Sequence, residues 1–126
     1  MDFQTPTRRV LGLGAAKEGV GHWWSQRMTA VALAPLAVLS ILPLGRAIGS
    51  DVETVRAIYA DPFTALTLLL FVVVAFRHLH LGLQVVIEDY VHHKAARVAA
   101  LFASTAFCAV FGLAGAFGVA KLAFGG

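Results

Sequence analysis

Three residues, His78, Asp89 and Tyr90, are of types and at spacings that can do chemistry together. An imidazole ligates haem iron or a metal, a phenol donates a hydrogen bond to a quinone carbonyl, and a nearby carboxylate organises proton delivery. Asp89 follows His78 by eleven residues, so on an α-helix they differ in direction by about 20° and share one face. The alternatives are a helix-to-helix hydrogen bond for His78 and a solvated helix end for Asp89 and Tyr90.

Two further polar residues flank His78. His80 is nine residues before Asp89 and points about 180° away from it on a helix, so the two histidines cannot serve one site. Arg77 must snorkel, pair with a carboxylate or reach a haem propionate. Arg27, at the start of the first apolar run, is suited to a charge-assisted bond with a propionate. Its alternative role is a positive anchor at the membrane surface.

Apolar segments must position these residues. Of the 126 residues, 59% are hydrophobic, more than a soluble domain of this size needs. A membrane span takes about 20 apolar residues, so we predict one membrane domain over residues 1–126 with spans at 25–48, 62–90 and 97–121. No room remains for a soluble catalytic domain, and any chemistry is therefore shared with partner chains.

The depth of His78 favours a function for its ring. It lies twelve residues before Tyr90, about 18 Å further into the membrane, where a polar group is costly unless it is paired or ligated. The first and third spans have no interior histidine, and His22 is expected to lie too near the boundary to meet His78. A second histidine ligand to iron would therefore come from another chain.

Packing features accompany the spans. Pro35 and Pro43 lie in the first span, where kinks are expected. Gly112, Ala116 and Ala120 recur every four residues in the third span. They predict either a stripe for close approach of another helix or a chance pattern in a helix rich in small residues.

The distribution of Lys and Arg predicts the topology. Basic residues concentrate before the first span and between the second and third, whereas the loop 46–61 is acidic in balance. The N-terminus is thus expected in the cytoplasm and the C-terminus in the periplasm. The first residues, including Arg8 and Arg9, show no apolar leader core, so we expect a multi-pass protein of a bacterial inner membrane. Nothing in the net charge of +3 suggests nucleic-acid binding.

His78, Gly82 four residues later and the pair Asp89-Tyr90, together with the entry His22 to Arg27, resemble the pattern of a family. This family is the hydrophobic membrane anchor of succinate dehydrogenase (complex II), in its alphaproteobacterial form. The companion anchor of that enzyme typically has a serine-histidine motif near its N-terminus, which is absent here. The resemblance covers the whole chain. It implies an all-α integral membrane protein whose three transmembrane helices pack with the companion anchor into a helical bundle.

The resemblance also implies residue roles. His78 would be an axial ligand to a b-type haem shared with the companion anchor, and Arg27 would lie near the haem propionates and the quinone pocket. Tyr90 would hydrogen-bond ubiquinone, with Asp89 supporting it and proton uptake. A flavoprotein subunit and an iron-sulphur subunit would dock on the cytoplasmic face, so the chain would act only as part of the enzyme. The alternatives are the anchor of a fumarate reductase and a haem-free structural assembly protein.

Overall fold

The computed structural model describes residues 16–125, which form four α-helices and no strand in this range. Three of the helices are long and apolar enough to cross a membrane, which confirms the predicted all-helical membrane fold. The basic residues Arg8 and Arg9 and the start of the chain lie outside the described range. The helices are α2 (Ala16–Ala47), α3 (Val52–Ala60), α4 (Pro62–Tyr90) and α5 (Lys94–Phe124).

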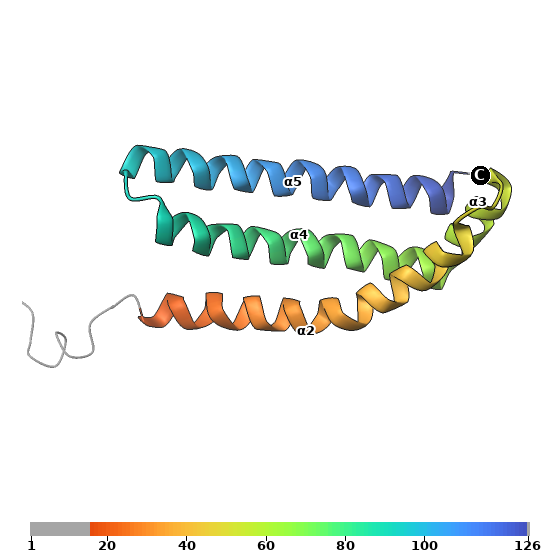
Figure 1. The fold of residues 1–126 in the computed structure, drawn as a ribbon, viewed down its shortest axis with the longest axis horizontal. Helices are drawn as coiled ribbons and strands as arrows, with labels where there is room; N and C mark the ends of the chain where they lie inside the picture. The colour runs from red at the N-terminus through yellow and green to blue at the C-terminus, as the bar shows by residue number, and fades with distance from the viewer. Residues whose placement is uncertain (1–15, 126) are drawn as a thin grey trace, which may run out of the picture.

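The three long helices lie side by side with α4 in the middle (Figure 1). α4 contacts both α2 and α5, whereas α2 and α5 do not contact each other within the described residues. Polar residues on opposite faces of α4 therefore meet different neighbours. This arrangement decides which histidine belongs to which site.

Local signals set where the helices begin and end. Asp61 caps α4, because its carboxylate accepts bonds from the Thr64 amide at 2.9 Å and the Thr64 hydroxyl at 3.0 Å, and Pro62 occupies the first turn. Gly49 has a φ of 81° after the end of α2, a conformation that favours glycine. α4 has the bounds expected for the second span, whereas α2 begins earlier than residue 25 and α5 extends past 97–121 at both ends.

The segment 46–61, predicted as a loop, contains the short helix α3. α3 contacts all three long helices at one end of the layer (Figure 1). Val55, Ile58 and Tyr59 are partly buried, whereas Val52 and Arg56 are exposed. The spacing of these three partly buried residues is that of one helical face, but the charges around them suggested a loop.

Few side chains are enclosed within the chain itself. The buried residues among those described are Ser40, Ala65, Thr67, Leu81, Cys108 and Val119. Large apolar residues instead face outward, including Phe102 at 77% and Phe117 at 70% exposure. So much exposed apolar surface fits a chain covered by lipid and by neighbouring helices.

Glycines bring α4 and α5 close together. A Cβ built on Gly115 would lie 3.0 Å from Val72, and one on Gly112 would lie 3.3 Å from Phe76. Gly112, one member of the predicted small-residue stripe, thus packs inside this chain. Pro35 lies within the uninterrupted helix α2, which bends in its C-terminal half (Figure 1).

Candidate functional site

His78 is held from α2 through one ring nitrogen. Its Nδ1 lies 2.9 Å from Thr29 Oγ1. The Thr29 hydroxyl donates to main-chain carbonyls of its own helix, with Ser25 O at 2.9 Å and Gln26 O at 3.0 Å, so its oxygen is the acceptor for His78 Nδ1–H. This bonding pattern assigns a proton to Nδ1, and Nε2 is the ring nitrogen that would carry the lone pair.

The second ring nitrogen of His78 has only a weak partner. Nε2 lies 3.5 Å from Gln26 Nε2, at the long limit for a hydrogen bond. Gly82 lies beside this amide, since a Cβ built on it would be 3.5 Å from Gln26 Nε2. That is ordinary van der Waals contact, so packing within this chain does not by itself require glycine at position 82.

His78 and Arg27 share a cavity of about 830 Å³ between α2 and α4. Its size is within the ~300–1,000 Å³ of typical ligand pockets. Two of its polar atoms, His22 Nε2 and Gln26 Oε1, are buried without a hydrogen-bond partner among the described residues. The His78 imidazole and the Arg27 cation in one cavity fit haem, whose iron takes an imidazole and whose propionates take a cation, and the Glu88 carboxylate lines the same cavity.

The structure places His22 on the lining of the same cavity as His78. It was expected to be too close to the membrane boundary to meet His78, yet both residues line this cavity. His22 lies one helical turn before Gln26, whose amide contacts His78. Among the described residues His78 bonds Gln26 and Thr29 and not His22, so the expectation that the two rings do not meet stays a prediction.

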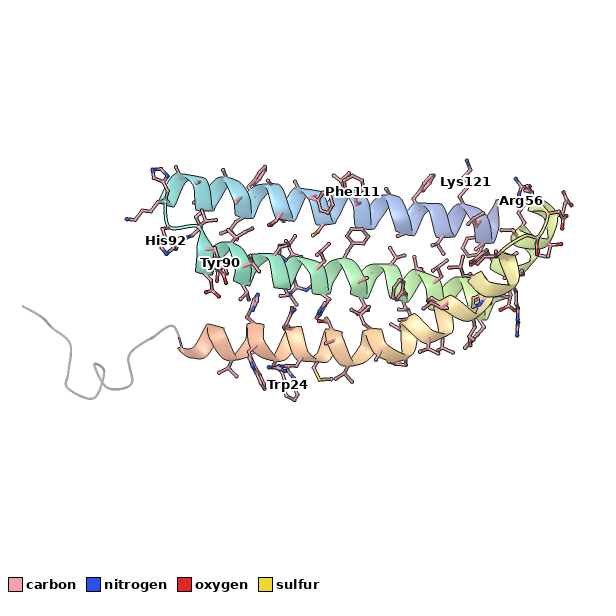
Figure 2. The ribbon with its side chains drawn as sticks, viewed as in Figure 1. Trp24, Arg56, Tyr90, His92, Phe111 and Lys121 are labelled. Carbon is pink, nitrogen blue, oxygen red and sulfur yellow. The ribbon has the colours of Figure 1, made fainter. Side chains whose placement is uncertain are left out.

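Arg27 is positioned by Trp23. The guanidinium carbon lies 5.1 Å from the centre of the Trp23 ring, a cation–π geometry, and Trp23 itself lines the cavity. Trp24 lies on the side of α2 that faces away from α4 (Figure 2). The two tryptophans therefore have different surroundings.

Asp89 and Tyr90 lie at the end of α4 and do not line the cavity. Tyr90 is 77% exposed and lies near His92 at the turn into α5 (Figure 2). The carboxylate that does line the cavity is Glu88, which accepts a bond from Gln84 at 2.9 Å. Within this chain, Asp89 and Tyr90 thus form a second polar group, open to a neighbouring chain.

His80 belongs to the opposite face of α4. Its Nε2 lies 3.0 Å from Thr105 Oγ1 on α5, and its Nδ1 lies 3.4 Å from an Arg77 nitrogen. This arrangement confirms the prediction that His78 and His80 serve different neighbours.

Thr29 and Glu88 were not predicted as site residues, and Gln26 entered only as part of the segment His22 to Arg27. Gln26 and Thr29 are three residues apart and therefore neighbours on one helix face, which was the available signal. Within residues 16–125 no cluster of three His, Cys, Asp or Glu side chains could hold a metal ion. A single axial histidine forms no such cluster.

The fold and the cavity define a small multi-pass membrane protein with a polar site between its first two long helices. The chain belongs to the family described as succinate dehydrogenase/fumarate reductase transmembrane subunit, which matches residues 1–114.

Relatives with curated names are similar over most of the chain. It is 37% identical over 102 residues to the succinate dehydrogenase hydrophobic membrane anchor subunit of Paracoccus denitrificans, covering 81% of this chain and 79% of that one. The corresponding protein of Rickettsia conorii is 32% identical over 110 residues, covering 86% and 87%. The succinate dehydrogenase membrane anchor subunit of Reclinomonas americana is 31% identical over 99 residues, covering 76% and 82%. No solved structure matches the chain significantly.

Proposed function

We propose that this chain is the membrane anchor of a succinate:ubiquinone oxidoreductase in a bacterial inner membrane. Its partners would be a companion anchor, an iron-sulphur subunit and a flavoprotein subunit. The family membership and the names of the relatives support this assignment. The chain then acts in electron transfer from succinate to quinone, and only as part of the complex.

The observation that carries the proposal is the state of the His78 ring. Thr29 accepts from Nδ1, so Nε2 is the nitrogen that would ligate haem iron, as in ligating histidines whose other nitrogen is fixed by an outer partner. His78 would hold a b-type haem with a histidine of the companion anchor, and Arg27 would pair with a propionate. The haem, when bound, supplies a one-electron redox centre.

The quinone contact is assigned to the end of α4. The exposed phenol of Tyr90 is available to donate a hydrogen bond to a ubiquinone carbonyl bound between subunits. The adjacent carboxylate of Asp89 would support Tyr90 and take part in proton uptake, and Arg27 would lie near the same pocket. The Lys and Arg distribution favours this end, with the N-terminus, on the cytoplasmic face where the soluble partners dock.

A haem-free structural role is the second candidate. The bond between His78 and Thr29 favours it, because this bond alone satisfies part of the ring inside the membrane.

The family description also includes fumarate reductase. Rates of succinate oxidation by ubiquinone and of fumarate reduction by quinol, measured on one preparation, would separate the two enzymes.

The experiment compares His78→Ala with His80→Ala in the complex purified through a tag on this chain. Dithionite-reduced-minus-oxidised spectra are recorded for both. We expect the b-type band to be lost in His78→Ala and kept in His80→Ala, since His78, unlike His80, lines the cavity with Arg27. An unchanged band in His78→Ala, or a colourless native complex, would return His78 to a packing role.

A further inference from the structure

A second polar cluster lies on the α5 side of α4 and has no part in the site above. The Thr105 hydroxyl donates to Leu101 O at 2.8 Å, so its oxygen accepts from His80 Nε2–H at 3.0 Å. His80 Nδ1 then carries the lone pair and accepts from Arg77 at 3.4 Å. The guanidinium has five donors, and this is its one hydrogen bond among the described residues.

Arg77 lies near the middle of the membrane. It is fifteen residues from Pro62 and thirteen from Tyr90 along α4, about 22 Å and 20 Å at 1.5 Å per residue. The side chain is exposed at the surface of the chain. A charged residue at this depth is costly unless it is paired, so Arg77 requires a counter-charge from outside the chain.

A groove between α4 and α5 runs beside this cluster. Its volume is about 370 Å³, and small residues line much of it. Small residues allow close approach of another helix backbone in a membrane. The lining includes Arg77, His80, Cys108, Ala109, Gly112 and Ala116.

Neither lipid nor a second copy of this chain brings an anion to this depth. Lipid phosphates lie at the surface, about 15 Å from the centre of a ~30 Å hydrocarbon layer. No acidic residue of the chain falls in the interior of a span: the seven are Asp2, Glu18, Asp51, Glu53, Asp61, Glu88 and Asp89. Arg77 also does not line the α2/α4 cavity that would hold the haem, which leaves a different protein as the source of the complementary charge.

We propose that the α4/α5 groove docks a transmembrane helix of a neighbouring protein of the complex, and that an aspartate or glutamate of this helix near mid-membrane pairs with Arg77. His80, held by Thr105, keeps the Arg77 guanidinium beside the groove that both residues line. The inference rests on the proposed function only in assuming that the chain works in a complex. It uses neither the haem nor the quinone.

The first test is site-specific photo-cross-linking in native membranes. A benzoyl-phenylalanine replaces Ala109 in the groove, and a matched control replaces Phe117, which lies on the same helix outside it. We expect Ala109 to cross-link to a transmembrane segment that contains an Asp or Glu, identified by mass spectrometry. Adducts only with lipid, with a second copy or with an uncharged segment would overturn the proposal.

The second test removes the charge. Arg77→Gln is expected to lower the neighbour recovered with the tagged chain roughly three- to thirtyfold after a detergent wash, the range for interhelical hydrogen bonds in membranes. Arg77→Lys should restore most of the recovery, and Arg56→Gln, an equal charge loss in α3, should have no effect. Equal losses in Arg77→Gln and Arg77→Lys would show that charge is not the determinant.

A charge exchange completes this test. Arg77→Glu combined with Arg at the cross-linked acidic position should recover association that either change alone removes.

Haem spectra of the same preparations are read separately. A native complex without a b-type band but with the Ala109 cross-link would contradict the proposed haem site and leave the docking groove standing.

Discussion

The Nδ1 atom of His78 lies 2.9 Å from Thr29 Oγ1, and this bond ties the middle of α4 to the first long helix. The threonine hydroxyl donates its proton to carbonyls within α2, so its oxygen accepts from Nδ1–H of His78. This bond places a proton on Nδ1 and holds the direction of the ring. Outer partners of this kind tune the ligands of metal sites. α2 therefore helps to build the site, in addition to spanning the membrane.

Replacing Thr29 with valine tests this bond directly. The change keeps the side-chain shape but removes the acceptor for Nδ1–H, and loss of such outer partners typically lowers metal affinity by about 10–100-fold. We expect Thr29→Val to reduce haem per complex, measured by the pyridine haemochrome assay. Ser25→Ala is the control, because among residues 16–125 the Ser25 hydroxyl donates only to the Gly21 carbonyl of its own helix. Full haem content in Thr29→Val would argue against the assigned tautomer.

Replacing Tyr90 with phenylalanine tests the quinone contact. Loss of one hydrogen bond of about 0.5–1.5 kcal/mol is expected to raise the KM for ubiquinone by roughly two- to tenfold. Succinate oxidation by a soluble dye acceptor should be unchanged, since it bypasses the membrane site. His92→Ala, on a neighbouring exposed side chain, is the control. Unchanged quinone kinetics in Tyr90→Phe would contradict the assignment.

The close contact of α4 and α5 predicts different effects of alanine at two glycines. A Cβ at Gly115 would lie 3.0 Å from Val72, whereas one at Gly118 meets nothing within 4 Å. Overpacking costs about 1–3 kcal/mol, so Gly115→Ala should lower the thermal midpoint of the detergent-solubilised complex relative to Gly118→Ala. Equal midpoints would show that the two helices separate without cost.

The cap at the start of α4 predicts a pH dependence. Hydrogen bonds from Thr64 lower the pKa of Asp61 below its ordinary value, the backbone amide having the larger effect and the hydroxyl the smaller. The stabilisation is thus present above the unfolded pKa of about 3.9 and is lost as the pH falls through the folded value. Asp61→Asn keeps an acceptor at the cap but removes this dependence.

The measurement for Asp61 is the difference in thermal midpoint between wild type and Asp61→Asn. It should be largest near neutral pH and shrink below about pH 4. Thr64→Val loses the hydroxyl but keeps the backbone amide. Its difference in thermal midpoint from wild type should have the same sign as that of Asp61→Asn and be smaller. A difference independent of pH would rule out the carboxylate as the source.

Features local to one helix could be predicted from the sequence. Long apolar runs require membrane spans, and helical phase alone separates His78 from His80 by direction. The expected range 62–90 has the bounds of α4, because the signal for its start, Asp61 followed by Pro62, is also local to this helix. The family resemblance likewise rested on fixed spacings within one span.

Only the tertiary structure decided which side chains meet across helices. Because lateral packing sets the register of α2 against α4, it brings Thr29 and Gln26 to His78 and places Glu88, rather than Asp89, on the cavity. It also folds part of the loop into α3 against the long helices. Sequence periodicity gives the direction of a side chain on its own helix, but the partner that it meets depends on how the helices pack.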